Sequence, residues 1–358
     1  MNHDQILDQL LPVYGLEPSK SDITPYGDGL INHTWKIVAK TATYILQQVN
    51  QDVFKQPSKI DENLKVLKNH LDQHYPGYLF VAPLPDLRGN SMVRTGGGYF
   101  RLFPFVEGSH SLNIAENPRE AYEAAKQFAL FSRLLNGLDV NKLHITLPDF
   151  HNLSLRYDQF LKAIEQASAY RKQRASELTD FVQANKEIAA AFKNIQETAE
   201  IPLRVVHHDT KINNVLFDAQ NNALCVIDLD TVMPGYFISD VGDMMRTYLS
   251  PANEEEKDMQ KIRVRPEFFK AIYDGYMQEM GQVLTPKEKT NFIYSGRFLI
   301  FMQGIRFLTD YLQNDSYYGA RYEEHNLVRA ENQFTLLKRY LESEETFREI
   351  MAETYIRN

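Results

Sequence analysis

Cysteine is almost absent from this sequence, because Cys225 is the only one among 358 residues. A single cysteine excludes an intrachain disulfide and a cysteine-rich zinc site. Cys225 lies in the apolar run 224–227, which predicts a packed strand residue. An excess of positive charge is absent too, since the formal net charge is −8. Nucleic-acid binding needs a basic surface, so this balance argues against nucleic acid as a partner.

Long apolar runs are also lacking. No stretch reaches the roughly 18 apolar residues of a membrane-spanning helix. The first residues show no basic region followed by an apolar stretch, so no signal peptide is expected. The hydrophobic share of 43% and the charged share of 24% are ordinary for a globular protein. We therefore expect a cytoplasmic protein with no membrane association and no obligate protein partner.

The predicted secondary structure changes near residues 105–110, from strand-rich to helix-rich. A chain of 358 residues exceeds the usual size of a single hydrophobic core, so two lobes are expected. We predict an α+β fold with a small strand-rich N-terminal lobe, residues 1–105, and a larger, mostly helical C-terminal lobe, residues 106–358.

Period-2 and period-3.6 patterns give the expected elements of each lobe. In the first lobe we expect a short helix within 1–17, a helix at 60–71, and strands at 34–38, 43–49, 78–84, 91–95 and 98–106. In the second lobe we expect a helix capped by Asn117, two helices within 157–198, and helices at 240–249, 266–280, 286–313 and 320–342.

The candidate chemistry lies between residues 205 and 231. Asp209 follows His208, Asn214 comes five residues later, and Asp228 ends the next apolar run. This is the spacing of a kinase catalytic loop, in which the first aspartate accepts the hydroxyl proton and the other two side chains bind Mg²⁺. Each element alone is common by chance, but the combination is specific. We predict Asp209 as the catalytic base and Asn214 and Asp228 as metal ligands.

The residues near these three are expected to have chemical or structural roles. Asp230 shares one side of an extended chain with Asp228, so it is a third candidate metal ligand or a turn cap. Lys211 is expected either to neutralise a transferring phosphate or to be a solvated loop lysine. His207 and His208 are expected to brace the loop. A further aspartate, Asp240, is expected to cap the next helix or to hold the loop's backbone from below.

The nucleotide side is expected in the first lobe. Gly27 and Gly29 occupy the loop between the first two strands, where glycines let backbone amides approach phosphate. Protein kinases carry a lysine on the third strand, but here Gln47 stands in its place. Glu62 on the next helix would then lack its usual partner, and Lys36 is one candidate to compensate. Phe105, where the lobes join, is expected to form an apolar wall for adenine.

The motifs at 207–214 and 227–231 resemble those of the aminoglycoside phosphotransferase-like kinases of small molecules. Three further stretches, 44–50, 243–246 and 304–312, bring the resemblance closest to bacterial N-acetylhexosamine 1-kinases. The resemblance spans nearly the whole chain. It implies a bilobal protein-kinase-like fold, with ATP and Mg²⁺ as cofactors. It also implies transfer of the γ-phosphate to the anomeric hydroxyl of the sugars GlcNAc or GalNAc, and it tolerates glutamine at position 47.

The acceptor side is less defined by the sequence. Arg306 is expected to hold sugar hydroxyls, or else to form an ordinary i,i+4 pair with Asp310. Arg246 is a further substrate-binding candidate, and tyrosines including Tyr248 and Tyr317 are weaker ones. Two alternatives remain open. One is a kinase of another small hydroxyl acceptor, such as an aminoglycoside, choline or an amino alcohol. The other is a catalytically silent kinase fold that serves as a binding protein.

Overall fold

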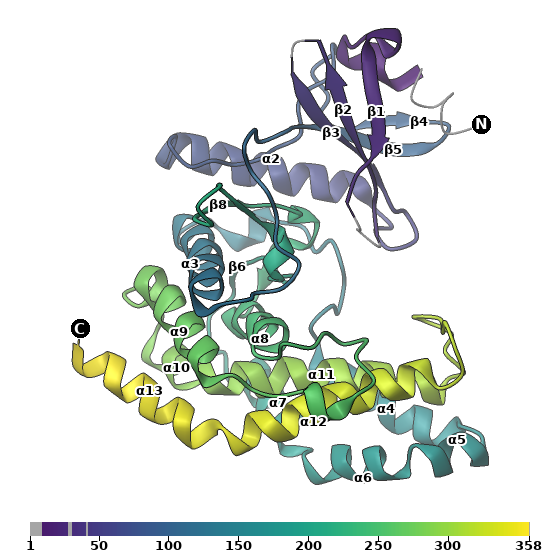
Figure 1. The fold of residues 1–358 in the computed structure, drawn as a ribbon, viewed down its shortest axis with the longest axis vertical. Helices are drawn as coiled ribbons and strands as arrows, with labels where there is room; N and C mark the ends of the chain where they lie inside the picture. The colour runs from purple at the N-terminus through teal and green to yellow at the C-terminus, as the bar shows by residue number, and fades with distance from the viewer. Residues whose placement is uncertain (1–8, 28–30, 41, 358) are drawn as a thin grey trace.

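The computed structural model describes residues 9–27, 31–40 and 42–357. The chain forms two lobes, one above the other in Figure 1, with the strands β1–β5 in the upper one and most helices in the lower one. The elements of the upper lobe are β1 (Ser21–Pro25), β2 (His33–Ala39), β3 (Thr43–Val49), α2 (Pro57–His74), β4 (Val93–Thr95) and β5 (Gly98–Pro104). The division at residue 105 stays a prediction, although β5 ends at Pro104.

The described strands of the upper lobe form one antiparallel sheet in the order β1-β2-β3-β5-β4. Successive side chains of a strand point to opposite faces of its sheet. One face is apolar and packs against Leu10 and Leu11; it carries Trp35, Ile37, Leu46, Phe100 and Leu102. The opposite face belongs to the intervening residues, among them Gln47 and Arg101. This second face is therefore the polar one.

The described part of the lower lobe contains helices and two short β-ladders. Its helices are α3 (Pro118–Leu134), α4 (Leu153–Gln166), α5 (Ala169–Arg174), α6 (Ser176–Ala184), α7 (Glu187–Thr198), α8 (Phe237–Tyr248), α9 (Pro266–Met280), α10 (Pro286–Thr290), α11 (Phe292–Leu312), α12 (His325–Glu342) and α13 (Glu344–Arg357). Its strands are β6 (Arg204–Val206), β7 (Val215–Phe217), β8 (Ala223–Val226) and β9 (Met233–Gly235). The strands pair as β6 with β9 and β7 with β8. Within the described residues, no helix is long and apolar enough to cross a membrane.

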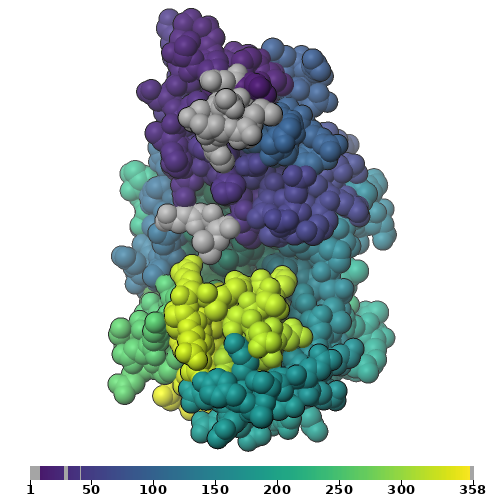
Figure 2. Space-filling view, turned by 90° about the vertical axis from the view of Figure 1, so that its right-hand side faces the viewer, coloured from purple at the N-terminus to yellow at the C-terminus, as the bar shows by residue number. Residues whose placement is uncertain are grey.

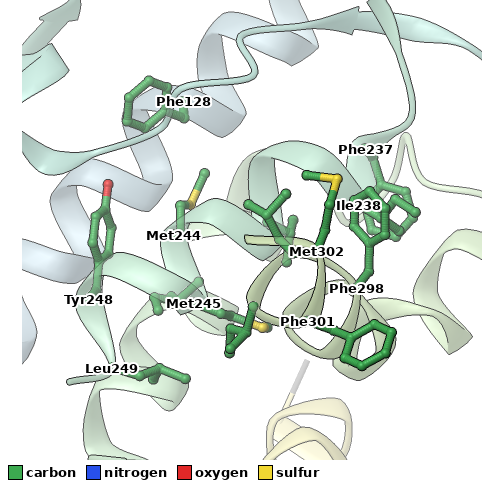
Figure 3. Packing of buried hydrophobic residues seen from close by; sticks show 14 of the residues in the cluster. Phe128, Phe237, Ile238, Met244, Met245, Tyr248, Leu249, Phe298, Phe301 and Met302 are labelled. Carbon is green, nitrogen blue, oxygen red and sulfur yellow. The ribbon is translucent and has the colours of Figure 1, made fainter. Parts of the chain in front are cut away.

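The core of the lower lobe forms where α8 crosses α11. Met244, Met245, Phe298 and Met302 are buried there, and Figure 3 shows them interleaved between the two helices. The helices approach closely at Gly242, because a Cβ atom there would lie 2.3 Å from the carbonyl oxygen of Ser295. This contact holds α8 rigidly beneath the loop that follows β6.

Helix α2 connects the two lobes through buried Asn63. Its side-chain nitrogen donates to the carbonyl oxygens of His144 and Val232, and its oxygen accepts from the backbone N–H of His144. Glu62 pairs with the His144 ring at 2.6 Å. Glu62 thus has no strand lysine as its partner, in agreement with the expectation, and pairs with a histidine of the lower lobe instead.

Some predicted elements differ from the structure. Residues 78–84 do not form a strand, because prolines 76, 83 and 85 interrupt the segment and leave a single bridge from Leu84 to Leu102. The stretch 157–198 contains parts of four helices instead of two. The predicted helix 286–313 is broken at Asn291, and the segment 320–324 precedes α12. Residues 1–8 of the predicted helix within 1–17 lie outside the described residues, and Leu11–Tyr14 form a 3₁₀ helix. Asn117 caps α3 as predicted, accepting from the backbone N–H of Glu120.

Candidate active site

The catalytic loop begins where β6 ends. Asp209 lies on this loop, and its Oδ1 atom is 3.1 Å from Lys211 Nζ. The amide nitrogen of Asn214 donates to the backbone oxygen of Asp209 and to its Oδ2 atom, at 2.9 and 3.1 Å. Burial opposes ionisation of Asp209, but the charge and hydrogen bond of Lys211, together with the charges of His207 and Arg246, outweigh it and hold the pKa of Asp209 below its usual value. The carboxylate is therefore ionised at neutral pH and able to accept a proton.

Helix α8 holds this loop from below through Asp240. The Asp240 carboxylate accepts the backbone N–H groups of His207 and His208 at 2.9 and 2.7 Å. This confirms that Asp240 holds the loop's backbone; the helix itself has Tyr236 at its N-cap position. One residue that it holds, His208, has a left-handed backbone with φ 66°. Strained residues of this kind need over-determined surroundings, and Asp240 supplies part of them.

Both histidines brace the loop, as predicted. The His207 ring contacts the backbone oxygen of Ile227 through Nε2, and the His208 ring contacts that of Thr231 through Nδ1, both at 3.0 Å. Since a carbonyl only accepts, these two ring nitrogens carry the protons. Burial lowers the pKa of His208 to about 4, so this ring is neutral at physiological pH.

A chain of paired carboxylates and arginines flanks the loop on the acceptor side. Asp243 accepts the backbone N–H of Thr210 at 2.9 Å and pairs with Arg246, also at 2.9 Å. Arg246 in turn pairs with Glu254 at 2.9 Å, and Glu254 pairs with Arg329 at 2.5 Å. Every member of this chain therefore has a partner of opposite charge, Arg246 included.

Asp228 follows β8, and its φ of 59° places it in the left-handed region. Its side chain is accessible to solvent, although many protein atoms surround it. Its deep position, together with the nearby carboxylates of Asp230 and Asp209, raises the pKa of Asp228 to about 7. A carboxylate surrounded in this way gains most from a bound cation, which removes the like-charge repulsion.

Asp230 turns toward the upper lobe. Its Oδ1 atom lies 2.6 Å from Arg101 Nη1, and its Oδ2 atom accepts from Asn32 Nδ2 at 2.9 Å. These contacts engage both of its oxygens with side chains of the sheet. We therefore propose Asp230 as a connection between the lobes, and not as a third metal ligand.

The donors that remain suit Mg²⁺. Asn214 uses its side-chain nitrogen on Asp209, which leaves its side-chain oxygen, together with the Asp228 carboxylate, as the candidate metal donors. Mg²⁺ in kinases is held by one or two such oxygens together with substrate phosphates. No group of three or more His, Cys, Asp or Glu side chains placed to hold a metal occurs in the described part of the chain. The residues thus fit a Mg²⁺ ion that is shared with phosphate.

The predicted nucleotide-binding residues lie on or next to the sheet. Gly27 is exposed after β1 with φ 76°, and Gly29 lies outside the described residues. Gln47 accepts from Arg101 and donates to Thr34 at 3.4 Å. Phe105 follows β5, and the Lys36 ammonium lies 4.1 Å from its ring centre. Lys36 therefore packs on Phe105, while Arg101 is the cation that contacts Gln47.

Arg306 is not the surface ion pair that its spacing allowed. Asp310 is buried and accepts the backbone N–H groups of Tyr317 and Tyr318 at 2.7 and 2.9 Å. Arg306 instead donates to Gln303, and its guanidinium lies within 6 Å of the rings of Phe150, Tyr317 and Tyr318. In Figure 2 the yellow-green segment that contains this tyrosine pair lies directly below the upper lobe.

The aromatic group around Arg306 reaches the catalytic loop. Phe150 stacks on His151 with 4.5 Å between ring centres, and His151 lies 5.3 Å from the His208 ring. His151 Nδ1 is buried without a hydrogen-bond partner. Tyr248 does not belong to this group; it is buried and donates to the backbone oxygen of Thr210 at 2.5 Å. Phe150 and His151 could not be predicted from the sequence, because they lie in a loop without a recognisable motif.

The chain is similar to one protein family and to several solved structures. Residues 22–271 match the model of the phosphotransferase enzyme family. A spectinomycin phosphotransferase, solved with ADP and spectinomycin, shares 14% identity over 92% of this chain and 97% of that chain, with a TM-score of 0.60. A microcompartment-associated aminopropanol kinase shares 15% over 96% and 98%, with a TM-score of 0.59. An ethanolamine kinase of Plasmodium vivax shares 14% over 88% and 83%, with a TM-score of 0.56.

These likenesses confirm the predicted protein-kinase-like fold, with an antiparallel sheet in the N-terminal lobe and a larger helical C-terminal lobe. Identities this low show the fold alone. The family match spans more than half of the chain and includes Asp209, Asn214 and Asp228. The chain therefore belongs to the phosphotransferase enzyme family.

Proposed function

We propose that this small-molecule phosphotransferase transfers the γ-phosphate of ATP to the anomeric hydroxyl of an N-acetylhexosamine, GlcNAc or GalNAc. The observation that carries the reaction type is the Asp209 carboxylate, ionised beside Lys211 and oriented by Asn214. The choice of acceptor rests on the resemblance of the sequence to N-acetylhexosamine 1-kinases and on the charges around the loop.

The residues divide the work of an in-line transfer. The acceptor oxygen forms a bond to the γ-phosphorus, the bond from that phosphorus to the β–γ bridging oxygen breaks, and the acceptor proton passes to Asp209. Lys211 lies beside Asp209, where it neutralises charge on the transferred group. Asn214 and Asp228 would hold Mg²⁺, which supplies positive charge to the phosphates. The products are ADP and the sugar 1-phosphate.

The charges near Asp209 favour a neutral acceptor. A cationic acceptor needs carboxylates free to receive it, but Asp243 and Glu254 are each paired with an arginine. Glu324, a further candidate acid for a cation, is paired with Arg174 at 2.6 Å. Arg306 and Arg156 lie close together. Burial of Arg156 lowers its pKa, and the charge of Arg306 is the next largest cause. Arginine donors and aromatic rings together suit the hydroxyls and the apolar face of a sugar.

An acceptor screen tests this proposal. Purified protein with MgATP is assayed for ADP release with GlcNAc, GalNAc, ethanolamine, choline, aminopropanol and spectinomycin. The proposal expects turnover with at least one N-acetylhexosamine and none with the amines. Turnover with an amine alone would replace the sugar by an amino alcohol or aminoglycoside. If no acceptor stimulates ADP release although the protein still binds nucleotide, the result would favour a catalytically silent binding protein.

A further inference from the structure

Arg101 occupies an unusual place in the sheet. It lies on β5 directly opposite Gln47 of β3, and Gln47 lies opposite Thr34 of β2. The three side chains are neighbours on the polar face. Gln47 Oε1 accepts from both Nε and Nη2 of Arg101, at 3.1 and 2.6 Å. Gln47 therefore fixes the plane of the guanidinium from the position where protein kinases carry their strand lysine.

The Arg101 guanidinium is held at the boundary of the lobes. Its side chain is 1% exposed, and the Asp230 side chain that it meets is 3% exposed. Asn32, in the turn before β2, donates to the same carboxylate. Its own side-chain oxygen accepts the backbone N–H of Asn50, the residue after β3. A buried cation is thus aimed from the sheet at the segment that carries Asp228.

The Arg101–Asp230 contact is close but incompletely satisfied. Arg101 Nη1 and Asp230 Oδ1 are 2.6 Å apart, yet both atoms are buried without a hydrogen bond of good geometry. Buried polar atoms in this condition are rare, and a catalytic role or a bound ion is one explanation for them. Nη1 faces Asp230, two residues after Asp228, so a shift of the Asp230 carboxylate would present Nη1 to an anionic oxygen that also contacts the metal.

We propose that Arg101 supplies the positive charge that holds the nucleotide's phosphates, in place of the strand lysine, with Gln47 as its positioning residue. The ligand class is a Mg²⁺-bound nucleoside di- or triphosphate. This inference rests on the proposed function as far as nucleotide use is concerned. Lys36 is not the substitute, because its ammonium packs against Phe105. Arginine also suits the site, because its fork contacts Gln47 and phosphate at the same time.

Binding of MgADP, measured by calorimetry without an acceptor, tests the inference. Arg101→Met leaves Asp230 unpaired and is expected to lower the melting temperature, so Arg101→Met/Asp230→Asn removes both charges together. The double variant is expected to recover stability but to bind MgADP at least about tenfold more weakly than the wild type. Asp230→Asn alone keeps the guanidinium and is expected to retain binding. Arg94→Met, an exposed arginine on β4, is the matched control.

Gln47→Leu tests the positioning role. It keeps the cation but removes the acceptor that orients it, so the KM for ATP is expected to rise while the KM for the acceptor stays unchanged. The inference is overturned if the wild type binds MgADP and the double variant binds it equally well; the proposed function then still stands. A wild-type protein that binds no MgADP would overturn both.

Discussion

The side-chain nitrogen of Asn214 donates to Asp209 Oδ2 at 3.1 Å, joining the proposed metal ligand to the proposed base. The same nitrogen also reaches the backbone oxygen of Asp209 at 2.9 Å. This arrangement fixes both side chains relative to each other within one short loop. It also turns the side-chain oxygen of Asn214 away from Asp209. The position of the proposed metal donor is therefore fixed relative to the proposed base.

Asp228→Asn is expected to raise the Mg²⁺ concentration for half-maximal activity at least about tenfold, since one carboxylate charge of the metal set is lost. Initial rates over a Mg²⁺ titration at saturating ATP and acceptor measure this. Asp180→Asn removes an exposed carboxylate on α6 and is the control. An unchanged Mg²⁺ requirement in Asp228→Asn would remove Asp228 from the metal set.

Arg306→Met is expected to raise the KM for the acceptor by about ten- to a hundredfold, because hydrogen bonds from a charged donor contribute about 1.5–3 kcal/mol. The KM for ATP is expected to stay the same, since Arg306 lies among Phe150, Tyr317 and Tyr318 of the lower lobe. Steady-state kinetics with each substrate varied in turn separate the two effects. Arg88→Met, at an exposed position of the upper lobe, should change neither constant. A rise in the ATP constant alone would contradict the assignment.

Acidification is expected to destabilise the fold through buried histidines. Burial lowers the pKa of His208 to about 4, so the unfolded state binds a proton below about pH 6.5 that the folded state refuses. Stability is therefore complete above that pH and is lost as pH falls from there toward 4. At about pH 5.5 the loss from His208 is about 1.4 kcal/mol.

Denaturant unfolding at neutral and acidic pH measures this loss. In His208→Gln the acid-dependent part should shrink, whereas in His74→Gln, an exposed histidine of α2, it should match the wild type. An equal loss in wild type and His208→Gln would show that His208 is not the responsible group.

Gly235→Ala is expected to destabilise the protein by about 1–3 kcal/mol and to lower kcat. An added Cβ atom would lie 2.4 Å from His208 Nε2 and 2.6 Å from Val206 Cγ2. Both neighbours are buried, so the catalytic loop must shift to make room. Melting temperature and steady-state rates measure the two effects, with Gly77→Ala as a control because nothing lies within 4 Å of a Cβ atom there. A variant with the stability and rate of the wild type would show that the loop yields freely.

The proposed catalytic residues could be predicted from the sequence because they are local. Asp209 and Asn214 share one loop, and Asp228 follows the next β-ladder, so spacing alone places them near one another. The polar face of the sheet was harder to predict. Arg101 meets Gln47 and Asp230 only through strand pairing and lobe contact, which no local pattern encodes. One signal was present: Arg101 interrupts the aromatic and aliphatic run 99–103, which points to a buried charge with a partner.

The acceptor side depended even more on tertiary structure. Arg306 and Asp310 have the spacing of a helical ion pair, but burial of Asp310 beneath the 315–319 turn gives its carboxylate to backbone N–H groups instead. Similarly, Phe150 and His151 reach the catalytic loop from a connection between helices. Which hydrogen-bond and ring partners these side chains meet depends on the three-dimensional packing, and residue spacing along one helix does not determine it.

Phosphorus NMR of the product formed from ATP and GlcNAc or GalNAc tests the central claim most directly, because it reports the reaction and the phosphorylated position together. The wild-type protein is expected to give a sugar 1-phosphate, and Asp209→Asn is expected to lower its rate by about 10²–10⁴ while still binding MgADP. Phosphate on another hydroxyl, or undiminished turnover in Asp209→Asn, would contradict the account.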